Sequence, residues 1–411
     1  TAVPPPMSGG GASIRDVVVV GGGPAGSTAA NLLAREGHDV LLLEKETFPR
    51  FHIGESLLPI DLPIFARLGV ELPLSRFLRK DGAEFIDERT GQHATFVFAE
   101  SLEGTPRSAY QVERSRFDEV LLRQAAARGA EVREGVKVTS VAFEDACVRV
   151  ETAGGVTRAR YLIDATGQDA LLARANRTVD PLKGFGCVAV FRHYDGLAPS
   201  VVAELVATGN IKILMVTDGW MWLIPLEGAR LSVGVVSRHA ISGPDTLERA
   251  EASSPLIQRL VAGAVGTPAR IIRNFSFRNL RSHGARWACV GDAACFLDPV
   301  FSSGVSLAML GGEAMADRLS PALRDGHEAA PDLMAAHAAR MLIGYRSFAA
   351  LIGRFYSAQL VQNLFFPETT GSPLRAGITS LLGGDLWRDD NPFQRMLLNS
   401  VSEEAWPAPP G

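Results

Sequence analysis

The sequence has few cysteines and no long uninterrupted apolar run. Its four cysteines, Cys147, Cys187, Cys289 and Cys295, do not have the spacing of metal ligands, and the first three lie in apolar runs typical of reduced core residues. No stretch approaches the roughly 20 consecutive apolar residues of a transmembrane helix. We therefore predict a cytoplasmic protein with no disulfide framework, no metal site and no membrane span.

The chain also lacks an excess of charge of one sign. Its 41 Lys and Arg against 45 Asp and Glu leave a formal net charge of −4, so we expect neither nucleic acid nor an acidic membrane surface as a partner. Residues 1–13 carry neither the charged nor the apolar region of a signal peptide, and we expect them to be disordered. The 411 residues suffice for two closely packed domains or one large domain with an insertion.

A strand–turn–helix–strand unit opens the part that we expect to be ordered. The apolar run 17–20 leads into a glycine-rich turn and the helical stretch 27–36, and a second apolar run, 40–43, follows. A further amphipathic helix is predicted at 116–128. This order is typical of a βαβ unit in an α/β domain with a parallel sheet.

The glycine-rich turn, GGGPAG, has the spacing of a dinucleotide site. Gly21, Gly23 and Gly26 form a GxGxxG pattern, whose backbone can approach a pyrophosphate without Cβ atoms in the way, at the N-terminus of a helix. Glu44, 18 residues after Gly26, can accept hydrogen bonds from ribose hydroxyls. The alternative is a purely structural turn. The predicted binding residues here are Gly21, Gly23, Ala25, Gly26, Glu44 and Lys45.

Between 186 and 237 the sequence alternates apolar and polar residues and contains no long helix. Asp218 with Gly219, and Glu227 with Gly228, indicate turns. A segment of this kind that interrupts a dinucleotide-binding domain predicts an antiparallel sheet, which would form a wall over the cofactor. Its four candidate strands are 187–193, 211–216, 220–225 and 231–236.

Two further segments favour FAD over NAD. Residues 161–167, YLIDATG, form an apolar strand that ends in a small-residue turn, and a second apolar strand leads into Asp292 of GDAACFLDPVFSSG. Together they resemble the glutathione-reductase-type FAD family, in its hydroxylase and halogenase branch. The resemblance implies that Asp292 holds the ribityl chain and that the helix from Gly304 points its N-terminus at the flavin, which favours the anionic reduced form. It also implies cofactor contacts from Arg50, Arg114, Asp164 and Gly167; for the two arginines a surface salt bridge is the alternative.

Three more motifs resemble the flavin-dependent halogenases. They are FPRFHIGESLLP at 48–59, a WxWxIP pattern at 220–225, and Lys80, at the place of that family's catalytic lysine. The resemblance covers about residues 16–320. It implies an α/β fold with a glutathione-reductase-type, Rossmann-like FAD-binding domain, an inserted antiparallel sheet as substrate domain, and a helical C-terminal region. The predicted boundaries are 14–70, 106–182 and 272–330 for the FAD-binding domain, 71–105 and 183–271 for the substrate domain, and 331–411 for the helical region with a flexible tail.

The tryptophan-rich strand predicts a wall beside the flavin. Side chains alternate along a strand, so Trp220, Trp222 and Ile224 share one face, and Pro225, which lacks an N–H, ends or edges the strand. Two indoles on one face can keep an organic substrate away from the flavin; the alternative is that they fill a core. A reductase family that saturates isoprenoid chains has a similar motif, so this strand alone does not fix the class.

Lys80 carries the chemistry that the resemblance implies. In this family reduced FAD, oxygen and a halide give hypohalous acid, which the lysine binds as a haloamine or polarises as an ammonium beside the substrate. A dry site would depress the pKa of Lys80; the alternative is a solvated surface lysine. The halide, chloride or bromide, is expected at the backbone N–H groups of Ser303 and Gly304, where a helix begins.

One departure from the tryptophan halogenases narrows the substrate. Those enzymes carry a glutamate, in a Glu-Ser-Thr-Gly string, that helps to deprotonate the ring; here the matching position is Phe301, in FSSG. The sequence therefore resembles the phenol- and pyrrole-type halogenases, whose ring is activated by its own hydroxyl or nitrogen and whose substrate is free or tethered to a carrier protein. No second nucleotide fingerprint is visible, so we expect a separate flavin reductase to supply reduced FAD.

Other classes remain open. A related FAD-dependent aromatic hydroxylase or isoprenoid-type reductase would use no halide, and a hydroxylase would be reduced directly by NAD(P)H and need no lysine at position 80. A non-catalytic protein with an FAD fold that escorts a lipidated or carrier-borne partner would retain flavin without reacting with oxygen. Lys80 and the complete WxWxIP pattern count against that third class.

Overall fold

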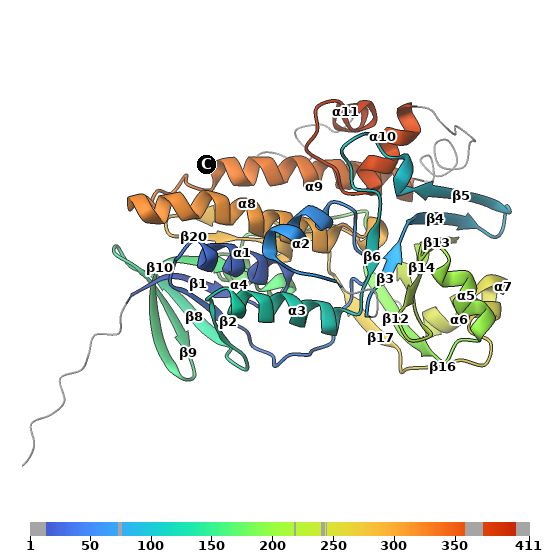
Figure 1. Ribbon diagram of the computed structural model, residues 1–411, viewed down its shortest axis with the longest axis horizontal. Helices are drawn as coiled ribbons and strands as arrows, with labels where there is room; N and C mark the ends of the chain where they lie inside the picture. Colours follow the sequence, from blue (N-terminus) through green and yellow to red (C-terminus); the bar gives the residue numbers. More distant parts are fainter. Residues whose placement is uncertain are drawn as a thin grey trace, which may run out of the picture.

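The computed structural model describes residues 14–72, 76–217, 219–239, 243, 245–357 and 373–399. The predicted disordered segment 1–13, the predicted turn residue Asp218 and the end of the predicted C-terminal tail lie outside these described residues. The described chain contains two large sheets at opposite ends of an elongated molecule, with long helices running along one side (Figure 1).

The predicted βαβ unit lies at the centre of the first sheet. β1 (Arg15–Val20) pairs in parallel with β2 (Val40–Leu43) and with β10 (Gly155–Asp164), and α1 (Pro24–Arg35) connects β1 to β2. The four valines at 17–20 are buried because both faces of this sheet are covered. The strand order is β19 (His283–Gly284), β20 (Trp287–Cys289), β10, β1, β2, β7 (Glu131–Arg133), with a hairpin of β8 (Val138–Phe143) and β9 (Val148–Thr152) beside β10.

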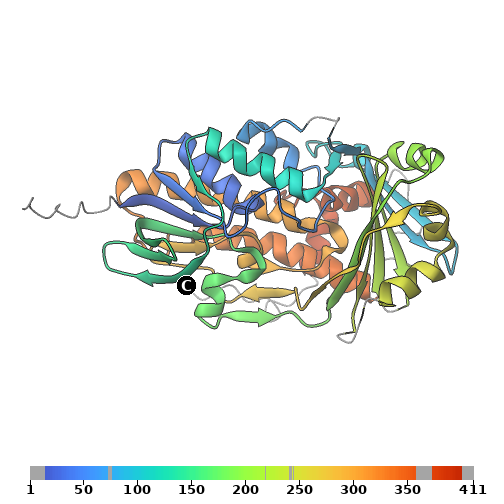
Figure 2. The same cartoon turned by 90° about the horizontal axis from the view of Figure 1, so that it is seen from below.

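Helices α1, α2 (Asp61–Leu68), α3 (Arg114–Ala127) and α8 (Ser303–Asp325) pack together beside the first sheet. α1 packs against α3 and against the long α8, and α2 also packs on α8. Figure 2 shows these helices beside the sheet from a second direction. α1 and α3 confirm the helices predicted at 27–36 and 116–128, within two to three residues at the start.

The second sheet contains the four predicted strands. They form β12 (Val188–Asp195), β13 (Ile211–Val216), β14 (Gly219–Leu226) and β15 (Arg230–Ser237), which pair in antiparallel fashion. The prediction that the sheet is antiparallel throughout is wrong at one pair. β4 (Gly82–Asp87) runs parallel to β13, because it enters from a distant part of the chain instead of through a hairpin. The strand order is β16 (Val265–Gly266), β12, β15, β14, β13, β4, β5 (Gln92–Val97), with β17 (Arg270–Arg273) beside β12.

Helices from the end of the described chain close the space between the sheets. α9 (Ala335–Tyr356), α10 (Pro373–Leu382) and α11 (Pro392–Asn399) pack over an apolar core that includes Trp220 and Trp222. The remaining elements are α4 (Leu171–Ala175), α5 (Pro199–Val206), α6 (Asp245–Ser253), α7 (Pro255–Leu260), β3 (Leu78–Lys80), β6 (Ala109–Gln111), β11 (Val179–Pro181), β18 (Phe277–Asn279) and β21 (Cys295–Phe296).

All four cysteines are unpaired, so the chain is not held together by disulfides among them. Every described helix is too short or too polar to cross a bilayer. Within the same residues no group of three or more His, Cys, Asp or Glu side chains is arranged to hold a metal ion.

Candidate functional site

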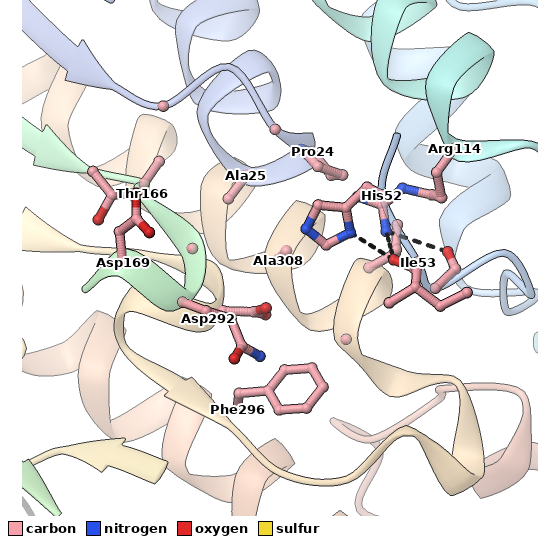
Figure 3. A pocket seen from close by; sticks show the side chains of 18 of the residues that line it. Pro24, Ala25, His52, Ile53, Arg114, Thr166, Asp169, Asp292, Phe296 and Ala308 are labelled. Carbon is pink, nitrogen blue, oxygen red and sulfur yellow. Dashed lines mark hydrogen bonds between the residues drawn. The ribbon is translucent and has the colours of Figure 1, made fainter. Parts of the chain in front are cut away.

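A cavity of about 870 Å³ lies where the parallel strands of the first sheet end. Its walls include Gly21, Glu44, Ala165 and Val290, which directly follow β1, β2, β10 and β20. Ligands of open α/β sheets bind at this carboxyl edge. Figure 3 shows Thr166 and Asp169 at one end of the cavity, His52, Ile53 and Arg114 at the other, and Asp292 between them. The predicted residues among its walls are Gly21, Gly23, Ala25, Glu44, Lys45, Arg50, Arg114, Gly167, Trp220, Trp222, Ile224, Asp292 and Gly304.

The three glycines of the motif lack a side chain for different structural reasons. A Cβ atom at Gly21, which has a φ of +107°, would lie 2.2 Å from the carbonyl oxygen of Ala165, and one at Gly26 would lie 1.9 Å from that of Gly21. These two glycines are therefore required by the turn itself. At Gly23 the nearest atom would be the Arg50 guanidinium, 3.6 Å away, so this residue keeps the cavity open. Gly26 does not line the cavity.

The start of α1 is a ready anion site. Its cap residue, Gly23, offers no side chain, and Pro24 follows at the first helical position. The amide N–H groups of this first turn therefore point to the cavity with the positive end of the helix dipole behind them. A pyrophosphate fits this position.

Glu44 and Lys45 lie at the next strand end. The Glu44 carboxylate is held by the N–H groups of Gly22, at 2.6 Å, and Glu46, at 2.8 Å. Each of its oxygens keeps a second lone pair with which it can accept a ribose hydroxyl. Lys45 forms an ion pair with Asp169, another wall residue, which the sequence did not single out.

Arg50 and Arg114 share one carboxylate. Arg114 donates two hydrogen bonds to Asp118, at 2.7 and 2.9 Å, and Arg50 contacts the same carboxylate at 3.0 Å. Burial alone would raise the pKa of Asp118, but Arg114 and Arg50 outweigh burial and lower it. Arg50 also lies 3.7 Å from the Glu46 carboxylate, so the two guanidinium groups face two carboxylates. Both arginines line the cavity, where their remaining N–H groups suit a phosphate. Arg114 is buried, so the alternative of a surface salt bridge is wrong for it.

Asp292 lines the middle of the cavity (Figure 3), where its carboxylate could reach the polar chain that it is predicted to hold. Burial raises the pKa of Asp292 to about 6, while Arg114 and a hydrogen bond with Gln168 oppose the rise. Gln168 also lines the cavity, and no motif had indicated it. Asp164, by contrast, lies behind the wall: its carboxylate accepts from the Thr166 and Leu172 N–H groups and fixes the turn after β10.

The start of α8 also faces the cavity. Ser302 adopts the left-handed conformation, with a φ of 57°, and Gly304 lines the cavity beside the ring of Phe296. Ser303 is buried and is not a wall residue. The first-turn N–H groups receive no capping side chain from the described residues, so they are available to a flavin or an anion.

The tryptophan strand forms a wall and a core at once. Trp220, Trp222 and Ile224 line the cavity from one face of β14, and the two indoles are also buried in the core under the C-terminal helices. Trp222 lies over Gly234 of β15, where a Cβ atom would be 2.2 Å from the indole. Pro225 lies beyond the last residue of β14 that pairs with β13, so its missing N–H leaves no gap in that ladder.

Lys80, at the end of β3, is 1% exposed, so the alternative of a solvated surface lysine is wrong. Its Nζ donates to Ser56 Oγ at 2.8 Å and to the carbonyl oxygen of Leu57 at 2.9 Å, with the Phe98 ring 5.3 Å away. Burial lowers the pKa of Lys80 to about 7, and the nearby carboxyl group of Asp61 opposes this. Ser56 also lines the cavity, so it connects the amine to the site.

The family that matches the sequence is described as tryptophan halogenase, over residues 16–107 and 99–368. The flavin-dependent halogenase armH1 of Armillaria mellea is 31% identical over 73% of this chain and 64% of its own, and a tryptophan 2-halogenase of Chondromyces crocatus is 36% identical over 70% and 57%. This chain thus spans less than two thirds of these two relatives. A 1H-pyrrole-2-carbonyl-[peptidyl-carrier protein] chlorinase of Pseudomonas fluorescens is 29% identical over 89% and 88%.

Solved structures share the fold over nearly the whole chain. A flavoprotein/dehydrogenase from Cytophaga hutchinsonii has a TM-score of 0.83 at 26% identity, over 94% of this chain and 96% of its own. The flavin-dependent brominase Bmp2 has a TM-score of 0.81 at 28% identity, over 95% and 99%. The chain belongs to the family of flavin-dependent halogenases, which are oxidoreductases. The cofactor of this family is FAD, and the helix start, the open Gly23, the arginines and Asp292 fit it.

Proposed function

We propose that this protein is an FADH2-dependent halogenase that uses oxygen and chloride or bromide to halogenate an electron-rich aromatic ring of phenol or pyrrole type. The observation that carries the proposal is Lys80. It is a buried amine held by two hydrogen bonds, and one of its partners, Ser56, is a wall residue of the FAD cavity. Burying an ammonium group costs stability, so a contribution to the stability of the fold does not explain a lysine at this position.

We assign the formation of the oxidant to the flavin side of the site and its transfer to the substrate to the Lys80 side. Reduced FAD, when bound, supplies the two electrons with which oxygen and a halide become hypohalous acid. The N–H groups of Ser303 and Gly304 hold the halide at the start of α8. Trp220 and Trp222 exclude the organic substrate from the flavin, so that the oxidant is the only species that passes.

Lys80 receives the oxidant. Its ammonium can donate its third N–H to hypohalous acid and polarise the oxygen–halogen bond. Its neutral amine can instead attack the halogen, which gives a haloamine and one molecule of water. A pKa near 7 makes both forms of Lys80 available at neutral pH. In either case the halogen is held at one place beside the ring, and proximity then supplies much of the rate.

The substrate class follows from Phe301. Its ring is buried, and it offers no carboxylate to take the proton from a halogenated ring. A phenol or a pyrrole loses that proton readily because its own hydroxyl or nitrogen stabilises the cation. The sequence relatives include a sulochrin halogenase and the pyrrole-carrier chlorinase, which supports this class. The second sheet would be the substrate domain, with the boundaries given above.

The setting of the reaction is also part of the proposal. A separate flavin reductase would supply reduced FAD, since the sequence shows one nucleotide fingerprint. We place the reaction in the cytoplasm, which suits four cysteines that form no disulfide with one another. The substrate would be either free or tethered to a carrier protein. A second candidate function is a flavin-dependent reductase, such as the isoprenoid type, which would transfer hydride and use no halide. The likeness to the Cytophaga protein, described as a flavoprotein/dehydrogenase, favours hydride transfer without naming a substrate.

The decisive experiment does not require the substrate. The protein is loaded with reduced FAD under anaerobic conditions, exposed to oxygen with or without bromide, desalted quickly, and assayed for a protein-bound oxidising equivalent. We expect a bromide-dependent equivalent that Lys80→Ala abolishes while FAD still binds. Lys212→Ala is the matched control, because Lys212 pairs with Glu84 on the second sheet. Equal yields with and without bromide, or retention in Lys80→Ala, would contradict the proposal.

A further inference from the structure

Asp61 is a buried carboxyl group for which the proposed function has no use. It is the first residue of α2, its exposed fraction is 0%, and its Oδ1 atom has no hydrogen-bond partner among the described residues. A buried carboxyl group without full hydrogen bonding is costly. The contacts of Asp61 therefore indicate what the buried carboxyl group does.

Its ordinary role would be to cap α2, but the geometry differs. A capping aspartate accepts from amide N–H groups two or three residues ahead, inside its own helix. The Oδ2 atom of Asp61 accepts instead from Leu58, three residues before it, at 3.1 Å, and from the hydroxyl of Ser306 at 3.0 Å. Ser306 belongs to the first turn of α8, whose start lines the cofactor cavity.

One peptide group joins Asp61 to Lys80. The carbonyl oxygen of Leu57 accepts from Lys80 Nζ at 2.9 Å, and the N–H of Leu58, which belongs to the same peptide unit, donates to Asp61 at 3.1 Å. A positive donor at the carbonyl end and a carboxylate at the N–H end polarise the amide in the same direction, so the two bonds strengthen each other.

We propose that Asp61 is a positioning residue for Lys80, which it holds through the peptide group between Leu57 and Leu58 and links through Ser306 to the first turn of α8. Two of the three N–H bonds of the ammonium point to Ser56 and Leu57, so the direction of the third is set by this frame. The amine and the start of α8, where we place the halide, then move as one unit. This inference rests on the proposed function of Lys80.

The charges of Lys80 and Asp61 also stabilise each other, because each opposes the effect of burial on the pKa of the other. Burial lowers the pKa of Lys80 to about 7, and Asp61 opposes it. Burial raises the pKa of Asp61 to about 7, and the Leu58 N–H, the Ser306 hydroxyl and Lys80 oppose it. Among the described residues, no other charged group from α2, β3 or α8 shifts either one. Without the carboxylate, the pKa of Lys80 falls further.

A titration of the lysines tests this without turnover. The chain has only five lysines, Lys45, Lys80, Lys137, Lys183 and Lys212, so protein labelled with ¹³C at lysine Cε gives few NMR signals, and Lys80→Ala identifies the one that matters. We expect the midpoint of Lys80 to fall by about one pH unit or more in Asp61→Asn, and by less, in the same direction, in Ser306→Ala. Asp87→Asn, the same change at a buried aspartate paired with Arg89, should leave it in place.

The outcomes separate this inference from the proposed function. A Lys80 midpoint that is unchanged in both Asp61→Asn and Ser306→Ala overturns the positioning role, whether or not the protein makes a halide-dependent oxidant. Where it does, the pH profile for bromination of phloroglucinol should shift to lower pH by as much as the NMR midpoint. A lower rate with neither shift would make Asp61 merely structural. If Asp61→Asn does not fold, Ser306→Ala alone decides.

Discussion

At the scale of single residues, Phe301 lies where a carboxylate would be costly. Its ring is 3% exposed and packs against Phe85 and Phe355, with ring centroids 6.4 and 5.7 Å away. A glutamate at this position would be desolvated among aromatic rings and would be protonated near neutral pH, because burial raises the pKa of a carboxyl group. A glutamate at position 301 would therefore need other neighbours than these rings in order to stay ionised.

We expect Phe301→Glu to destabilise the protein without raising its activity on a phenol. The free energy of unfolding should drop by about 3 kcal/mol or more, the cost of a large buried ring replaced by an unpaired polar group. Phe301→Leu is the matched control and should lose only about 1 kcal/mol. Urea unfolding measures both. A stable Phe301→Glu protein that turns over tryptophan would contradict this account of the site.

The burial of Lys80 could not be predicted from its own neighbours. The string RKDGAEF reads like a surface turn, and only the resemblance to a family marked the lysine. Its depth depends on 56–57, β6 and Phe98, which the fold brings together. Asp61 gave no signal at all, because an aspartate after Pro59 at the start of a helix looks like an ordinary capping residue.

At the scale of elements, the start of α1 separates the needs of the fold from those of the cofactor. Gly26 faces the backbone of the turn, whereas Gly23, with a φ of −70°, could carry a Cβ atom without strain. The same motif therefore contains one glycine that the chain needs in order to fold and one that only a ligand needs.

Alanine at these two positions should separate stability from binding. We expect Gly23→Ala to change the free energy of unfolding of the FAD-free protein by less than about 0.5 kcal/mol, but to weaken FAD binding by about tenfold or more, since the methyl group occupies the approach to the helix start. Gly26→Ala should unfold at a clearly lower urea concentration. Fluorescence titration with FAD measures the first effect, and weak binding with normal stability in both variants would contradict the assignment.

The positions of the strands in the sequence were predicted better than their pairing in the sheet. Alternation fixed β14 and β15 to within one residue at each end, because each strand carries its own period-two pattern. The parallel pairing of β4 with β13 joins segments more than 100 residues apart, and no local pattern records such a contact. The cofactor turn was likewise found from local spacing, whereas Gln168 and Asp169 were not, since they enter the cavity only through the path of the chain after β10.

At the scale of the whole molecule, the end of α9 links the second sheet to the segment that precedes α8. Tyr356 at its end accepts from the Trp220 indole at 3.0 Å and donates to Asp298 at 2.8 Å, and Asp298 also accepts from Gly186 and Val300 N–H groups. One hydroxyl group thus connects the tryptophan wall, the segment before α8 and the C-terminal helices.

We expect Tyr356→Phe to weaken this connection. The Trp220 N–H and the Asp298 carboxylate each lose a partner, which should lower the free energy of unfolding by about 1 to 3 kcal/mol. Tyr110→Phe, at a half-buried tyrosine beside the other core, is the matched control. Thermal unfolding followed by tryptophan fluorescence is the measurement, and equal melting temperatures for the two variants would contradict the connection.

The tryptophan wall has one more consequence. An indole is itself an electron-rich aromatic ring, and Trp220 and Trp222 both line the cavity in which the oxidant would be produced. When no substrate is present to react with the halogen, the oxidant can react instead with the indole rings of the cavity wall. The working life of such an enzyme is then limited by the number of idle cycles that it completes, and damage should accumulate first at these two side chains.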